Sequence, residues 1–148
     1  MVLADMAQDL ARLDIRLLAT DIDPQMIARG RAAVYEETTL STIPKPLQRF
    51  VTLEKDGVHI VPALRNLVSF RELNLHDTTW PMRGRFDIVF CRNVVIYFDE
   101  PTQAKLWQRF KALLAPTGRL YVGHSERVGD AAFESDGQTV YRLAGGQR

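Results

Sequence analysis

The stretch Phe86–Asp99 constrains the fold of this chain more than any other, because a short apolar run in it changes abruptly to polar residues. Its first half, Phe86–Cys91, predicts a strand that is buried on both faces of a parallel sheet. In open α/β sheets, ligands bind outside the carboxyl ends of the strands. We therefore expect Arg92, Asn93 and Tyr97, which follow this strand, to lie at a ligand site.

The composition indicates one soluble domain. The 148 residues are 46% hydrophobic, which suffices for one core. Lys and Arg (19) nearly balance Asp and Glu (18), so bulk charge predicts neither nucleic-acid binding nor attachment to an anionic membrane. The one cysteine, Cys91, argues against a disulfide framework. No apolar run approaches a membrane span of about 18 residues, and Met1–Asp5 lacks signal-peptide features, so we expect a cytoplasmic protein.

Strand and helix patterns alternate along the chain, and this predicts an α/β fold with a doubly wound, mostly parallel sheet, an antiparallel edge and a small β-hairpin insertion. The predicted strands are Ile15–Thr20, Val68–Leu75, Phe86–Cys91, Arg119–Gly123 and Thr139–Leu143, with Phe133 in an antiparallel partner of the last. The predicted helices are Met1–Leu13, Pro24–Ala33 after an Asp23 cap, and one from Asp99 that Pro116 and Gly118 end. Residues 36–46 are expected to be irregular, and Phe50–Val61 to form a hairpin with its turn at Lys55–Gly57.

Two further polar residues follow predicted strands. Asp21 can accept hydrogen bonds from ribose hydroxyls, or it can form part of the turn before the next helix. Asn74 has the donor and acceptor that an adenine edge needs, although asparagine at a strand end commonly forms a turn. The run His124–Glu126 does not predict a hydrolase triad, since triad members come from separate elements.

Four motifs in this order resemble the CheR family, the chemotaxis receptor methyltransferases that use S-adenosylmethionine. They are Ala19–Asp23, Leu73–Leu75, Phe86–Asp99 and Gly123–Glu126. The resemblance implies cofactor binding by Asp21 at the ribose, by Asn74 and Leu75 at the adenine, and by Arg92 and Asn93. It implies that Tyr97 stands near the transferred methyl group, and we assign Tyr97 and Arg92 as candidate catalytic residues.

The resemblance also implies the reaction, which is methylation of glutamate side chains on the cytoplasmic domain of a chemotaxis receptor. A glutamate carboxylate is already ionised at neutral pH and needs no general base to attack a sulfonium methyl group. We expect no metal, because His59, His76 and His124 lack metal-site spacing. We also expect no nucleic-acid partner and no direct membrane insertion.

The family pattern has an N-terminal helical domain, and a first central strand with a glycine-containing loop that would precede Met1. We therefore expect 1–148 to be a partial methyltransferase catalytic domain, truncated at its N-terminus, with a β-subdomain inserted at about 44–67. Loss of a central strand leaves unpaired edges, so we expect this chain alone to bind the cofactor weakly or not at all, and to self-associate through the incomplete sheet. The alternatives are a non-catalytic binding or regulatory remnant of the fold, and a small-molecule methyltransferase.

Overall fold

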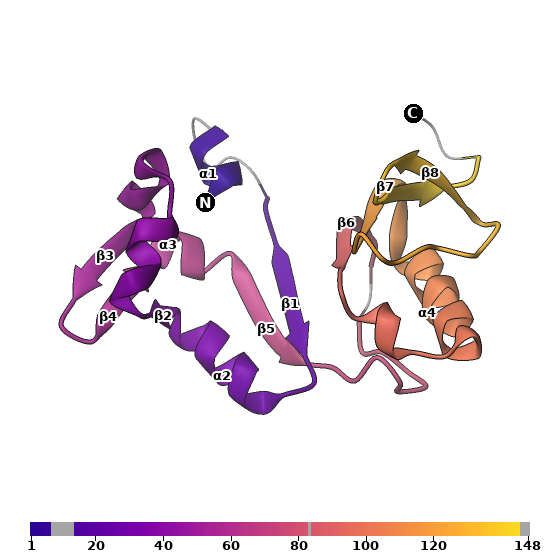
Figure 1. Ribbon diagram of the computed structural model, residues 1–148, viewed down its shortest axis with the longest axis horizontal. Coiled ribbons are helices and arrows are strands. Elements are labelled where there is room, and N and C mark those ends of the chain that lie inside the picture. Colours follow the sequence, from indigo (N-terminus) through magenta and orange to yellow (C-terminus); the bar gives the residue numbers. More distant parts are fainter. Residues whose placement is uncertain (7–13, 83, 146–148) are drawn as a thin grey trace. The chain divides into compact units, whose positions relative to one another are not determined.

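A computed structural model describes residues 1–6, 14–82 and 84–145 of the chain. The fold divides into two compact units, Met1–Asp77 and Thr78–Arg148 (Figure 1). No helix in the described parts of the chain is long and apolar enough to cross a membrane.

The first unit is organised around two parallel strands. β1 (Leu17–Asp21) pairs with β5 (Val68–Glu72), with Asp21 opposite Glu72 at their carboxyl ends. Helix α2 (Pro24–Ala32) follows β1 and lies along this strand pair (Figure 1). The Phe70 ring of β5 lies against Gly30 of α2, so a larger residue at position 30 would require this ring to move.

The predicted hairpin forms, and a third strand joins it. β3 (Val51–Glu54) and β4 (Gly57–Ile60) are antiparallel, and β2 (Val34–Tyr35) pairs with the other edge of β4. β2 was not predicted, because a strand of two residues is too short to show an alternating pattern. The unit also contains α1 (Val2–Met6), the 3₁₀ helices η2 (Glu37–Thr42) and η3 (Lys45–Phe50), and α3 (Pro62–Arg65).

The second unit is a four-stranded sheet with one long helix. The strand order is β6 (Phe86–Cys91), β7 (Leu114–Val122), β9 (Val140–Leu143) and β8 (Phe133–Gly137). β6 and β7 are parallel, and the other pairs are antiparallel, as predicted for the last two strands. Helix α4 (Glu100–Leu113) buries one side, and the core of this unit includes Leu106, Trp107, Phe110, Leu114, Leu120 and Val122. The short 3₁₀ helix η4 (Val95–Tyr97) lies between β6 and α4.

Several local predictions are confirmed. Asp23 caps α2 by accepting a hydrogen bond from the Gln25 amide at 2.7 Å, and Pro24 takes the first helical position. Asp99 caps α4 in the same way through the Thr102 amide at 3.0 Å. The strand Phe86–Cys91 has the predicted bounds.

Other predictions are wrong in ways that have physical causes. α4 ends at Leu113 and β7 begins at Leu114, well before the predicted Arg119, and an irregular register between β6 and β7 accommodates Pro116. Residues 36–46, predicted as irregular, include η2 and the start of η3. Of the predicted helix Met1–Leu13, residues 7–13 lie outside the described part, and Val2, Leu3 and Met6 are exposed rather than packed on a sheet.

The predicted burial of Phe86–Cys91 on both faces is also wrong, and the first strand is likewise less buried than its apolar sequence indicates. On β6, Ile88 is 50% exposed and Phe90 is 70% exposed. Phe90 stacks on Tyr121 of β7 at 4.8 Å between ring centroids, which covers one side of the ring only. Leu17 of β1 is 43% exposed. Among the described residues, β1 and β6 each have one strand neighbour and therefore lie at the edge of their sheets. A parallel strand is buried on both faces only where other elements cover both faces of the sheet.

Candidate functional site

The loop after β6 presents three of the predicted site residues. The chain leaves the strand at Cys91, and Asn93 adopts a left-handed backbone conformation with φ of 59°. Arg92, Asn93 and Tyr97 are exposed, and Tyr97 keeps 80% of its surface accessible. Among the described residues, no protein hydrogen bond or ion pair engages the side chains of Arg92 and Tyr97. These two side chains are therefore available to a ligand.

The backbone of this loop is held from two sides. Val95 is 2% exposed and anchors it to the core of the second unit. From α4, Gln103 Nε2 donates hydrogen bonds to the carbonyl oxygens of Val95 at 3.3 Å and Phe98 at 2.9 Å. The loop therefore has a fixed backbone and an exposed polar surface.

The other anchor is Glu126, a residue that the sequence analysis set aside. Its side chain is 3% exposed, and its carboxylate accepts hydrogen bonds from four backbone N–H groups. Oε1 accepts from Val94 at 2.8 Å and Val95 at 2.7 Å, while Oε2 accepts from Asn93 at 3.0 Å and also from Gly123. The available sequence signal was a glutamate three residues after Gly123, in the turn that follows a predicted strand. Three of its four partners, however, lie about thirty residues earlier in the chain.

The same arrangement determines the charge state of two buried groups. Burial by itself raises the pKa of Glu126, but the backbone hydrogen bonds outweigh it and hold the pKa of this carboxyl below its usual value. Burial, and secondarily the charge of Glu126, raises the pKa of the Cys91 thiol to about 12. Cys91 is therefore a protonated, buried side chain and not a nucleophile.

Asp21 and Asn74 lie at the carboxyl end of the strand pair in the first unit. The Leu73 amide donates a hydrogen bond to the Asp21 carbonyl at 2.9 Å, which ties the two strand exits together. Asp21 Oδ1 accepts a hydrogen bond from the Asp23 amide at 2.9 Å, so the side chain does contribute to the turn. Within the described residues, no protein donor reaches its Oδ2 oxygen, and the side chain is exposed.

Asn74 also forms a turn. Its Oδ1 accepts a hydrogen bond from the His76 amide at 2.9 Å, and its carbonyl accepts one from Asp77 at 3.1 Å. Asn74 and Leu75 are half-buried. Among the described residues, no protein acceptor engages the side-chain NH₂ group of Asn74, so this group can contact a ligand edge.

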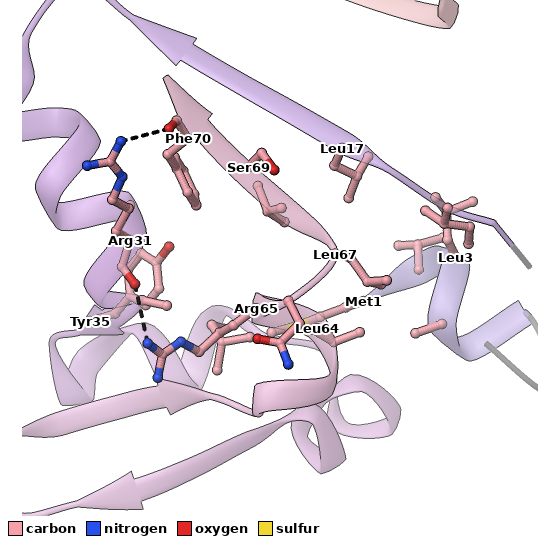
Figure 2. Close-up of a pocket in the computed structure, with 18 of the residues that line it drawn as sticks. Met1, Leu3, Leu17, Arg31, Tyr35, Leu64, Arg65, Leu67, Ser69 and Phe70 are labelled. Atoms are coloured by element: carbon pink, nitrogen blue, oxygen red, sulfur yellow. Dashed lines mark hydrogen bonds between the residues drawn. The ribbon is translucent and has the colours of Figure 1, made fainter. Parts of the chain in front are cut away.

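A cavity of about 720 Å³ in the first unit contains none of the predicted cofactor-binding residues (Figure 2). Apolar side chains line most of it, and these include Leu3, Leu17, Tyr35, Leu64, Leu67 and Phe70. The arginines at its rim are engaged with backbone carbonyls, since Arg31 Nη2 donates to Phe70 at 2.9 Å and Arg65 Nη2 donates to Arg31 at 3.4 Å. The cavity therefore offers shape and apolar surface with little polar chemistry.

The β3–β4 hairpin brings together one group of potential metal ligands, which the sequence analysis did not anticipate. Ligand atoms of Glu54, Asp56 and His59 lie within 4.8 Å of one another. His59 Nε2 and Asp56 Oδ1 are already hydrogen-bonded at 2.8 Å. This side-chain hydrogen bond is the main reason that the pKa of Asp56 is lowered. We interpret the group as a hairpin ion pair with a neighbouring carboxylate.

Comparison with known proteins decides the family. The family described as "CheR methyltransferase, SAM binding domain" matches residues 1–141. The chain belongs to this family. Its α/β architecture, with parallel and antiparallel strand pairs, is that of the CheR S-adenosylmethionine-binding domain, and S-adenosylmethionine is the cofactor that the family's description names.

Curated relatives of this CheR chain are named as chemotaxis protein methyltransferases. A "Probable chemotaxis protein methyltransferase" of Rhizobium etli is 46% identical over 142 residues, which cover 90% of this chain and 53% of the relative. "Chemotaxis protein methyltransferase 2" of Pseudomonas aeruginosa is 41% identical over 137 residues, covering 88% of this chain and 49% of the relative. A "Chemotaxis protein methyltransferase" of Klebsiella aerogenes is 41% identical over 133 residues, covering 84% and 46%. The CheR chain thus spans about half the length of the curated relatives it matches.

Proposed function

We propose that this chain is part of a cytoplasmic protein-glutamate O-methyltransferase, which transfers a methyl group from S-adenosylmethionine to glutamate side chains of chemotaxis receptors. Membership of the CheR family and the names of the relatives support this proposal. The observation that carries it is structural. Polar side chains with free hydrogen-bonding capacity follow β1 and β6, which are the strand ends where α/β sheets bind ligands.

The residues of the first unit fit the nucleoside part of the cofactor. Asp21 is exposed and uses Oδ1 for the turn, which leaves Oδ2 to accept a hydrogen bond from a ribose hydroxyl. The Asn74 amide can donate to an adenine edge while its oxygen stays bonded to His76. Leu75 then borders the ring. These three roles follow the family resemblance, and the hydrogen-bonding capacity seen here is consistent with them.

Arg92, Asn93 and Tyr97 are proposed to contact the cofactor and the reacting groups. The Arg92 guanidinium is a permanent cation that can hold a carboxylate by two parallel hydrogen bonds. The Tyr97 hydroxyl can donate a hydrogen bond, and its ring can exclude water from the methyl group. The fixed backbone of the loop places these side chains without loss of further backbone freedom on binding.

The chemistry requires little from the protein beyond placement. When bound, S-adenosylmethionine supplies an electrophilic methyl group on a sulfonium. The acceptor glutamate is ionised at neutral pH, so no side chain has to remove a proton. Catalysis by this chain would therefore depend on alignment of the carboxylate by Arg92 and on exclusion of water by Tyr97.

We further propose that the two strand pairs belong to a doubly wound sheet with one more central strand. β1 has β5 as its one described strand neighbour, and β6 has β7, so each presents an edge to which another strand can bond. Residues 44–67 are proposed to be an inserted β-subdomain. In support, β3 and β4 form a sheet with β2 that is separate from the parallel pair.

The test is a calorimetric titration of the 148-residue chain with S-adenosylhomocysteine, the product form of the cofactor. Asp21→Ala should weaken binding at least tenfold, which corresponds to about 1.4 kcal/mol. Asp23→Ala is the matched control, because it removes the cap of α2 two residues away and should cost about 1 kcal/mol of stability without loss of affinity. Unchanged binding by Asp21→Ala would contradict cofactor binding by Asp21. No binding by the wild-type chain up to millimolar ligand would instead favour the alternative, in which this chain is a non-catalytic remnant of the fold. Methyl transfer to a receptor cytoplasmic domain then tests the substrate.

A further inference from the structure

Glu126 connects the turn after β7 to the loop after β6, and it is the one buried charged residue of the described chain. We infer that Glu126 is a positioning residue that holds Arg92–Tyr97 in its ligand-binding conformation. This inference rests on the proposed function, since it concerns the same loop. Glu126 itself acts through the backbone, because both of its carboxylate oxygens are engaged with amide groups.

The geometry requires a carboxylate at this position. Three successive amides, those of Asn93, Val94 and Val95, point at one side chain, and the Gly123 amide joins them. Convergent N–H groups of this kind form an anion-binding concavity. A carboxylate has two oxygens and accepts from all four donors, whereas a glutamine has one oxygen and would direct an NH₂ group at other donors. Glutamine is therefore not a conservative replacement here.

The loop conformation needs such an anchor. Asn93 has a positive φ, which is unfavourable for residues other than glycine, although asparagine tolerates it better than most. A strained conformation persists only where surrounding contacts determine it. The amides of Asn93, Val94 and Val95 donate hydrogen bonds to Glu126. The carbonyl oxygens of Val95 and Phe98 accept hydrogen bonds from the Gln103 side chain. Arg92 and Tyr97, whose side chains are exposed, therefore belong to a loop whose backbone is fixed by both Glu126 and Gln103.

The turn that carries Glu126 is built to allow this contact. Its own amide donates to the Gly123 carbonyl at 3.1 Å, which closes a tight turn at the end of β7. A Cβ on Gly123 would lie 2.7 Å from Glu126 Oε2, so a glycine is needed for the carboxylate to reach the loop. Beside it, a small cavity of about 220 Å³ is lined by Val95, Gln103 and Glu126 among others. Truncation of Glu126 to alanine would enlarge this cavity, and acetate could then supply the missing carboxylate.

The experiment follows the loop directly by amide hydrogen exchange in the wild-type chain, Glu126→Ala and Glu126→Gln. Both variants should raise exchange at Asn93, Val94 and Val95 at least tenfold relative to the rest of β6 and β7. Leu114→Ala is the matched control, because it destabilises the same core from the opposite end of β7 and contacts none of these amides. Acetate should restore protection in Glu126→Ala, and it should have no such effect in Leu114→Ala.

Affinity for S-adenosylhomocysteine provides the functional readout. We expect it to fall at least tenfold in Glu126→Ala and to recover with acetate. The positioning role would be overturned if the loop amides stayed protected from exchange in both Glu126 variants. It would also be overturned if the amides lost protection but the affinity for S-adenosylhomocysteine did not change. If the wild-type chain does not bind S-adenosylhomocysteine, the proposed function of this chain fails, while exchange and acetate rescue still decide whether Glu126 holds the loop.

Discussion

Gly123 and Asn93 approach each other so closely that a Cβ added to Gly123 would lie 2.6 Å from Asn93 Oδ1 and 3.0 Å from the Asn93 backbone nitrogen. The two residues follow the parallel strands β7 and β6, and both amides bond to Glu126. The two strand exits are thus packed against each other at the carboxyl edge of the sheet. Loop placement at this edge therefore depends on a glycine at position 123.

Substitution of Gly123 should therefore disturb both stability and the loop. Gly123→Ala adds a methyl group where two oxygens and a backbone nitrogen leave no room, and overpacking of this kind costs about 1–3 kcal/mol. We expect urea unfolding to show that loss and S-adenosylhomocysteine affinity to fall with it. Gly129→Ala is the control, because nothing lies within 4 Å of its added Cβ. Equal stability of the two variants would contradict the close contact.

The charge of Glu126 gives stability a defined pH dependence. Its pKa is lower in the folded chain than the ordinary value of 4.5, so the unfolded chain takes up the proton first as pH falls. The stabilisation is fully present above about pH 4.5 and is lost as pH falls through the folded-state pKa. The difference in unfolding free energy between wild type and Glu126→Gln should be constant from about pH 7 to pH 5.5 and shrink below about pH 4.5. A difference that stayed constant down to about pH 3 would show that folding does not lower the pKa of Glu126.

Local chemistry in the sequence predicted the local structure well. Asp23 and Asp99 were identifiable as helix caps because a cap bonds to an amide two or three residues away. Asp56–Gly57 marked the turn of the hairpin, where Gly57 has φ of 137° and a Cβ would lie 2.4 Å from the Tyr35 carbonyl oxygen. The strand Phe86–Cys91 was visible as an apolar run that stops at a charged residue.

Long-range relationships could not be predicted in the same way. The role of Glu126 depends on amides that lie about thirty residues earlier, and only the pairing of β6 with β7 brings them into reach. Burial of β6 was mispredicted because an apolar run shows what a strand can bury, while its neighbours decide what is buried. Asp21 and Asn74 proved to have turn roles, and these leave one carboxylate oxygen and one amide group for a ligand.

Tyr97 offers a test that separates chemistry from packing. Its side chain is 80% exposed, so Tyr97→Phe should change the free energy of unfolding by less than about 0.5 kcal/mol. If the hydroxyl acts on the reacting groups, the rate of methyl transfer by the active enzyme should fall at least tenfold in Tyr97→Phe. The affinity for S-adenosylhomocysteine should be retained. Tyr97→Leu, which also lacks the aromatic ring, serves as the comparison for loss of ring contact. Full turnover by Tyr97→Phe would leave the ring, and not the hydroxyl, as the functional group.

The exposed apolar face of β6 predicts self-association of the isolated chain. Ile88 and Phe90 lie two residues apart and therefore project from the same side of the strand. Burial of apolar surface contributes about 25 cal/mol per Å², so a second copy that covered both side chains would be favoured. Sedimentation velocity should show concentration-dependent association that Phe90→Thr weakens at least tenfold. Leu53→Thr is the control, because Leu53 is also exposed but lies on the hairpin of the first unit, and it should leave association unchanged. A wild-type chain that stayed monomeric at every concentration, or equal weakening by both variants, would show that β6 is not the associating surface.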